Sequence, residues 1–232
     1  MRVRVTTTAA GITAAALLAL PACSSHANKT APSATSSSAR SARPAVPEPG
    51  SAPLSSAALT ERLLVAGDLG SGYTRKLERA EHNDDVTVLG CPALEDLGGD
   101  AATGGSLDVP RQAKTAFTYA GSGDSETSEE LYSDAPGKLS DGMGKIFDAM
   151  TGCPKYQVLV GGSAIDIATR KTAPPQVGDE QWSQLLTFSA GGRDSVMKQT
   201  AIRDGNVLVI VSGSPALVDR HVDKALTKAT SR

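Results

Sequence analysis

The N-terminal segment and the cysteine that follows it constrain this chain most. The segment starts Met-Arg-Val-Arg, continues with an apolar run from Ala9 to Leu20, and reaches Cys23 through a Pro-Ala step. A basic start, a short apolar run and small residues before a cut are typical of a bacterial secretory signal. The run is too short to anchor the chain in a bilayer, because a transmembrane helix needs about 20 apolar residues. We therefore expect residues 1–22 to be removed and the remainder to fold outside the cytoplasm.

A cysteine directly after the small residue makes this segment a lipobox. The pattern resembles the signal of bacterial lipoproteins, in which the cysteine thiol takes a diacylglyceryl group and becomes the new N-terminus. The resemblance implies that Cys23 is the lipid attachment site. The membrane would then be a partner through this anchor, and the protein would lie on the extracytoplasmic face of the cell membrane. The alternative is a plain secreted protein in which Cys23 has no such role.

Cys91 and Cys153 are the two cysteines that remain. The compartment outside the membrane is oxidising, so an even pair predicts a disulfide. In the chain-entropy model, closing a loop of about 60 residues stabilises the fold by roughly 4 kcal/mol. Two free thiols are the alternative. We expect no metal site, because two isolated cysteines without paired histidines do not make a zinc ligand set.

Charge and aromatic content argue against several classes of partner. The chain has 25 acidic and 23 basic residues, and two of the basic ones, Arg2 and Arg4, belong to the signal. Nucleic-acid binding and polybasic membrane patches both need clustered Lys and Arg. The chain also has only one Trp, three Phe and four Tyr, which leaves few platforms for stacking bases or sugars. We therefore expect no nucleic-acid partner.

Composition divides the mature chain into a tether and a globular domain. Residues 23–56 are rich in Ser, Ala and Pro, and such a segment cannot bury enough apolar surface to fold. A flexible tether of this length reaches roughly 30 Å, which would hold the domain away from the membrane. Residues 57–232 have a globular composition, and their length suits one domain.

Residue patterns over 57–232 predict an α+β domain. Helix signals fall from about Thr60, a possible cap, to Gly70, after Pro92, and over 136–150 and 215–229. Strand signals fall at 112–119, 127–133, 156–160, 165–170, 181–189, 195–202 and 207–211. The last strand reads Val-Leu-Val-Ile-Val without polar alternation, which predicts a central strand buried on both faces. We expect a twisted, mainly antiparallel sheet of six or seven strands with helices packed on one face and one disulfide.

No residue set in the sequence points to catalysis, a metal or a cofactor. The three histidines, His26, His82 and His221, lack metal-ligand spacing, and His221 is expected to be exposed on the last helix. A Ser-His-Asp triad has no fixed spacing, but Gly162-Ser163-Ala164 lacks the second glycine of a nucleophile elbow. The glycine-rich run 67–72 follows a helix and lacks the Lys-Ser/Thr end of a phosphate loop. We therefore assign no catalytic residue.

Two acidic pairs and the single Trp are further candidate site residues. Asp84-Asp85 and Glu129-Glu130 lack the alternating ligands of a calcium loop, so we interpret them as solvated charges. Trp182 is either the floor of a pocket or part of the core. Its place in a strand favours the core.

The order of several segments resembles a known family. The segments are Leu-Leu-Val-Ala-Gly-Asp-Leu-Gly-Ser-Gly-Tyr-Thr at 63–74, Gly-Cys-Pro-Ala-Leu at 90–94, Ala-Phe-Thr-Tyr at 116–119, an amphipathic helix ending at Cys153, and Arg-Asp-Gly-Asn at 203–206 before an apolar strand. Over about residues 57–230 they resemble the extracellular sensor domain of PknH-type actinobacterial serine/threonine kinases, and the lipoproteins that carry this module alone.

The resemblance implies a twisted antiparallel sheet with helices and disulfides around a cleft thought to bind an unidentified ligand. The family often has a Trp shortly before the second cysteine, and its kinase members have a second disulfide. This chain has Met150-Thr151-Gly152 at that place and no further cysteines. Ligand-binding residues are therefore left unassigned.

We expect a sensor-type lipoprotein that recognises an unknown small molecule or protein at the cell envelope, without catalysis or a cofactor. One alternative is an envelope carrier of a lipid or other apolar ligand, which would need a large apolar cavity. A cell-wall enzyme or its inhibitor is another, although no residue signature supports it.

Overall fold

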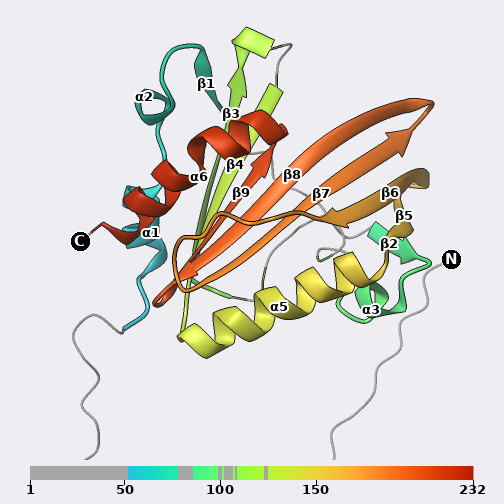
Figure 1. Ribbon diagram of the computed structural model, residues 1–232, viewed down its shortest axis with the longest axis horizontal. Helices are drawn as coiled ribbons and strands as arrows, with labels where there is room; N and C mark the ends of the chain where they lie inside the picture. Colours follow the sequence, from blue (N-terminus) through green and yellow to red (C-terminus); the bar gives the residue numbers. More distant parts are fainter. Residues whose placement is uncertain are drawn as a thin grey trace, which may run out of the picture. The chain divides into compact units, whose positions relative to one another are not determined.

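A nine-stranded antiparallel sheet organises the domain (Figure 1). The computed structural model describes residues 52–77, 86–98, 101, 107, 109–122 and 125–231. The strand order is β1-β3-β4-β9-β8-β7-β6-β5-β2, and each neighbouring pair is antiparallel. The strands are β1 (Tyr73–Lys76), β2 (Val86–Leu89), β3 (Gln112–Tyr119), β4 (Ser125–Ser133), β5 (Lys155–Val160), β6 (Ser163–Lys171), β7 (Glu180–Ala190), β8 (Arg193–Asp204) and β9 (Val207–Gly213).

The expected strand number, six or seven, is wrong because two short edge strands carry no readable pattern. The seven strands from β3 to β9 all overlap the predicted ranges. The two that were missed, β1 and β2, have four residues each and lie at opposite edges of the sheet. Each buries only one fully inward-facing side chain, Tyr73 in β1 and Val88 in β2. A single buried residue gives no alternation from which a strand can be recognised.

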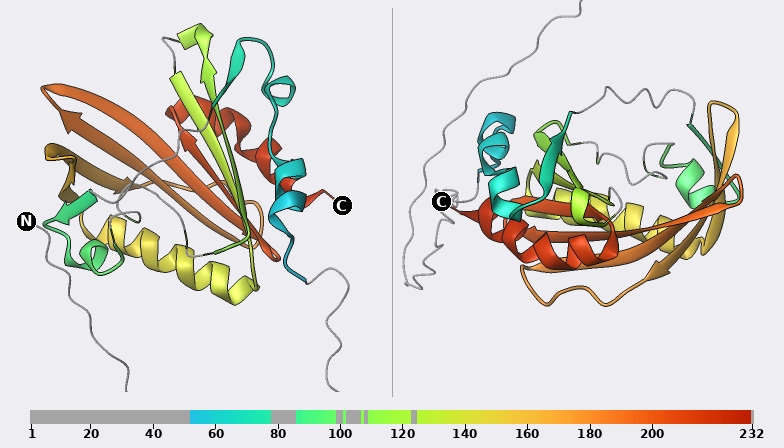
Figure 2. Two further views of the ribbon diagram at one scale, coloured as in Figure 1. Left: turned by 180° about the vertical axis from the view of Figure 1, so that it is seen from behind. Right: turned by 90° about the horizontal axis from the view of Figure 1, so that it is seen from above.

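Helices occur before, between and after the strands along the chain. They are α1 (Ser56–Arg62), α2 (Ala66–Leu69), α3 (Pro92–Glu95), α5 (Pro136–Gly152) and α6 (Pro215–Thr230), with a 3-10 turn η1 (Ala120–Ser122). In Figure 2, α1 lies beside α6, and α3 lies beside one end of α5. None of the described helices combines the length and apolar character needed to cross a membrane.

Helices cover both faces of the sheet, so the expectation of helices on one face is also wrong. On one face α5 packs on Leu208 and Ile210 of β9, within a core that includes Met143 and Met150. On the other face α1 and α6 pack on the alternate residues of the same strand. These alternate residues are Val207, Val209 and Val211.

The uninterrupted apolar run of β9 explains this two-sided cover. All five residues of Val-Leu-Val-Ile-Val are at most 4% exposed, and successive side chains of a strand point to opposite faces. Both faces must therefore be shielded from water. The prediction of a central strand buried on both faces is confirmed, and it is incompatible with helices on one side.

Two-residue turns that contain glycine close the β5–β6 and β8–β9 hairpins. Val160 pairs with Ser163 across Gly161-Gly162, and Asp204 pairs with Val207 across Gly205-Asn206. Gly161, Gly162 and Gly205 have φ between 54° and 81°, a region that favours glycine. The turn signals in the sequence therefore placed these hairpins correctly.

Cys91 and Cys153 are joined by a disulfide with a Cα–Cα distance of 5.7 Å. Cys91 is the residue before α3, and Cys153 is the residue after α5. The bridge thus fastens the segment between β2 and α3 to the end of the helix that covers one face. Cys23, the predicted signal at 1–22 and the predicted tether up to residue 51 lie outside the described residues, as do His26, His82 and Asp84-Asp85.

Candidate functional site

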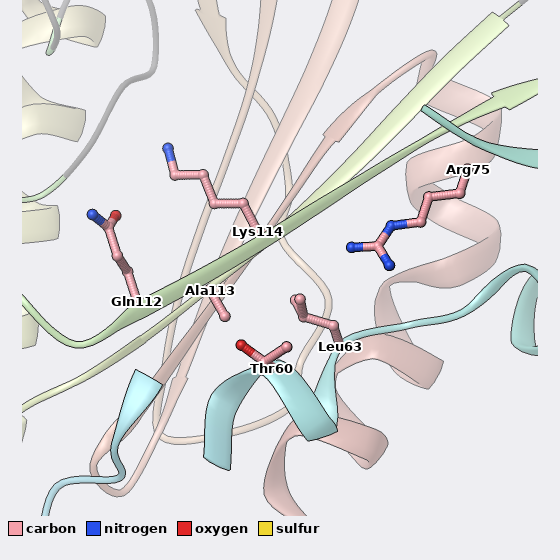
Figure 3. A pocket seen from close by; sticks show the side chains of 6 residues that line it. All are labelled: Thr60, Leu63, Arg75, Gln112, Ala113 and Lys114. Carbon is pink, nitrogen blue, oxygen red and sulfur yellow. The ribbon is translucent and has the colours of Figure 1, made fainter. Parts of the chain in front are cut away.

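A groove of about 380 Å³ lies at the β1 edge of the sheet, between α1 and β3. Figure 3 shows Thr60, Leu63 and Ala113 turned toward one another, with the side chain of Arg75 reaching toward them from β1. Gln112 and Lys114 complete the lining from β3. The groove has an apolar floor and a polar, cationic rim, which suits a ligand that carries both apolar and anionic groups.

The groove exists because β1 is shorter than the strand it pairs with. β1 covers only Ala116–Tyr119 of β3. Among the described residues, no strand pairs with the outer edge of β3 from Gln112 to Thr115. Helix α1 lies alongside this uncovered half, and the hydroxyl of Ser56 accepts a hydrogen bond from the Gln112 backbone N–H at 3.2 Å. That contact closes one end of the groove.

Two cations border the groove, and they differ in their partners. Lys114 lies 3.1 Å from the carboxylate of Glu130. Arg75 is exposed and has no ion-pair partner within the part of the chain that the structure describes. The guanidinium of Arg75 therefore keeps its hydrogen-bond donors available for an anionic group in the groove.

A buried carboxyl lies on the strand behind the groove. Glu129 of β4 is 1% exposed, and its Oε2 accepts a hydrogen bond of 2.6 Å from the backbone N–H of Leu64, directly after the groove residue Leu63. Its other oxygen, Oε1, has no partner among the described residues, and the same holds for Oγ1 of Thr115, which faces Glu129 across the β3–β4 ladder. The interpretation of Glu129 as a solvated charge is wrong, because α1 and the segment after it cover it.

Burial raises the pKa of Glu129 to about 7. The charged form loses hydration in this environment, and the Leu64 hydrogen bond and the charge of Lys228 offset only part of that loss. Two further contacts fix the same segment. The carboxylate of Asp68 accepts hydrogen bonds from the Val65 backbone N–H and from Lys228 of α6, at 2.9 Å and 2.5 Å. The wall of the groove is thus tied to β4 and to α6 through carboxylates.

An aromatic cluster lies further along β1. The hydroxyl of Tyr73 is 2.6 Å from Nε2 of His221, and the ring of Tyr73 stacks on Tyr119 at 4.6 Å between centroids. His221 is 5% exposed, so the expectation that it is exposed is wrong. Burial, with the nearby Arg220 and Lys224, lowers the pKa of His221. The hydrogen bond between the neutral imidazole and the Tyr73 hydroxyl holds α6 against β1, which is a structural role.

The remaining sequence candidates lie in other places. Trp182 packs partly buried against the core beneath α5, as its strand position predicted. Ser163 begins β6 in a hairpin, so it does not stand on a strand-to-helix elbow. Within the described ranges, no three His, Cys, Asp or Glu side chains gather as metal ligands. No separate pattern in the sequence identifies Thr60, Arg75 and Lys114, which come from three elements.

Comparison with known proteins identifies the fold. No protein-family model matches the chain, and no curated protein matches it. Among solved structures, it is similar to the extracellular domain of PknH from Mycobacterium tuberculosis, with 11% identity and a TM-score of 0.59, over 79% of this chain and 100% of that one. An uncharacterized protein from Mycobacterium smegmatis aligns with 11% identity and a TM-score of 0.43, over 75% of this chain and 97% of that one. The domain therefore has the fold of the PknH extracellular domain, as the sequence resemblance implied.

Proposed function

We propose that this protein is a lipid-anchored binding domain on the extracytoplasmic face of the cell membrane, where it recognises a ligand or partner without catalysing a reaction. The groove between α1 and β3 carries the proposal, since it combines an apolar floor with Arg75, a cation that no described carboxylate pairs with. Similarity to a protein described as an extracellular domain supports the location. A signal that passes through such a domain would need a partner protein.

The lining of the groove favours a binding domain over a lipid carrier. A carrier needs a large apolar cavity. Four of the six residues that line this groove, Thr60, Arg75, Gln112 and Lys114, are polar or charged. A polar or anionic ligand matches this lining better than an acyl chain does.

The ligand proposal is tested by native mass spectrometry of the full-length chain, solubilised from the envelope of a bacterium that lipidates it. We expect a copurifying mass that denaturation releases. The double variant Arg75→Gln/Lys114→Gln should lose that mass. The matched control Lys145→Gln/Arg193→Gln, at two exposed sites away from the groove, should retain it. Equal retention by both variants would place binding elsewhere in the protein, and an empty wild-type chain would contradict a stable ligand.

The anchor is tested separately at Cys23. We expect the N-terminal peptide of the wild-type protein to begin at Cys23 and to carry the added mass of a diacylglyceryl group. The variant Cys23→Ala should lack that mass, because no thiol remains to be acylated. It should also no longer appear in the membrane fraction as a processed protein. The variant Ser25→Ala keeps the thiol and should behave like the wild type. A wild-type peptide with an unmodified Cys23 would contradict the anchor.

A further inference from the structure

We propose that the outer edge of β3 from Gln112 to Thr115, which no described strand covers, binds an extended, acidic peptide segment of a partner protein, which adds to the sheet as a strand in line with β1. The inference rests on the proposed binding function and names the class of partner. Strand addition gives affinity through backbone hydrogen bonds and specificity through alternate side chains.

The direction of the backbone groups supports this geometry. In an antiparallel ladder the N–H and C=O of one residue point to the same side, and the side alternates along the strand. The carbonyl of Arg111 accepts the Ser133 N–H at the end of β4, and the Gln112 N–H points to Ser56 on the other side. Even-numbered residues of β3 therefore point outward, in agreement with the Ala120–Gly72 bond at 3.0 Å. Lys114 thus presents both its N–H and its C=O to the groove.

The length of the open edge sets the length of the peptide. The last pair of the β1–β3 ladder is Lys76 with Ala116, and Ser56 closes the edge at Gln112. Between these limits lie the four residues Gln112–Thr115, which span about 14 Å at the rise of an antiparallel strand. A peptide of about four extended residues fits, which is as long as β1 itself.

Side chains along the edge determine the chemistry of that peptide. Residues that face each other in a ladder share one face of the sheet. A peptide residue opposite Lys114 would lie beside the Lys114 ammonium, and one opposite Thr115 would lie on the face that Arg75 occupies. A residue opposite Ala113 meets the groove floor formed with Leu63. Acidic side chains at the first two positions and a small apolar one at the third complement the groove.

Open strand edges attract other chains, and proteins usually shorten or charge them. Here the edge is short, and Glu130 already pairs with Lys114, so Arg75 supplies the unbalanced positive charge that disfavours a basic strand. In two copies of this edge the unbalanced charges, both from Arg75, would have the same sign. That like-charge contact argues for an acidic partner and against self-association.

The test uses the full-length chain and an eight-residue probe of Val and Asp that contains the run Asp-Asp-Val. Hydrogen exchange followed by mass spectrometry should show the Lys114 amide exchanging fast in the protein alone, and at least about tenfold slower with saturating probe. A probe with Lys in place of Asp should give no such protection. Fast exchange that the Val-Asp probe leaves unchanged would overturn the inference. Slow exchange in the protein alone would do so too, because the edge would then already be paired.

A matched pair of variants separates the backbone from the side chain. Lys114→Gln removes only the charge, whereas Lys114→Pro also removes the outward N–H, which edge strands tolerate. We expect Lys114→Pro to weaken the probe's Kd about tenfold relative to Lys114→Gln, as the loss of one hydrogen bond predicts. Equal Kd values for the two variants would exclude strand addition. If Lys114→Pro does not fold, the exchange data on the wild type decide.

Other occupants give different results. Protection of the same amides that depends on protein concentration and needs no probe would indicate a second copy and overturn the inference. An envelope ligand that protects amides elsewhere would also overturn it, while leaving the proposed binding function intact. A chain that captures nothing and carries no lipid at Cys23 contradicts the proposed function itself.

Discussion

Replacing Cys153 with Ser is expected to lower the free energy of unfolding by roughly 4 kcal/mol, within the 2–5 kcal/mol range found when native disulfides are removed. The bond joins residues separated by 62 positions, so its loss releases a long loop in the unfolded chain. It also frees α3 from the end of α5, which covers one face of the sheet. Urea unfolding at pH 6 under non-reducing conditions measures the difference.

Two comparisons control this prediction. The double variant Cys91→Ser/Cys153→Ser should match the single variant, since both lack the bond. Intact mass of the untreated wild type should be about two mass units below that of the reduced protein. If reductant leaves the urea midpoint of the wild type unchanged, the disulfide does not contribute to stability.

Glu129→Gln is expected to remove a large part of the pH dependence of stability. The pKa of Glu129 is about 7 in the folded protein, against an ordinary value of 4.5 for a glutamate side chain. The folded state therefore holds a proton that the unfolded state releases. The contribution of this bound proton to the free energy of unfolding is fully present below pH 4.5. It falls as the pH rises toward 7 and is absent above that pH. The loss between pH 5 and pH 8 is about 2–3 kcal/mol.

The glutamine variant cannot ionise but keeps an acceptor for the Leu64 N–H. Its free energy of unfolding should therefore match that of the wild type near pH 5 and exceed it by about 2–3 kcal/mol at pH 8. Thermal or urea unfolding at both pH values tests this. Glu126→Gln, at an exposed position of the same strand whose side chain pairs with Lys76, is the matched control and should keep the wild-type pH dependence. A Glu129→Gln variant that also keeps it would show that Glu129 ionises normally.

The origin of the Glu129 environment shows why the sequence did not predict it. Glu129 and Glu130 are adjacent and chemically identical, but they point to opposite faces of β4. Glu130 meets Lys114 and the hydroxyl of Tyr132. Glu129 is covered by a segment 65 positions earlier in the chain, at Leu64. No local pattern distinguishes the two, because the cover comes from distant elements.

The groove, like the environment of Glu129, is formed by segments that are distant in the sequence. Its residues come from α1, β1 and β3, and β1 itself leaves no alternation in the sequence. The shape of the groove depends on where β1 stops along β3 and on how closely α1 approaches the edge. Both are outcomes of packing between segments that are separate in the chain.

The sequence by itself determined the seven longer strands, the glycine turns between them, helices α5 and α6, and the α+β class. These features depend on local periodicity and backbone preference, which neighbouring residues carry. The tertiary structure alone decided the two edge strands, the cover on both faces, the burial of Glu129 and His221, and the groove beside Arg75. Each of these depends on which distant surfaces meet, and that is set by the burial of the whole core rather than by any one segment.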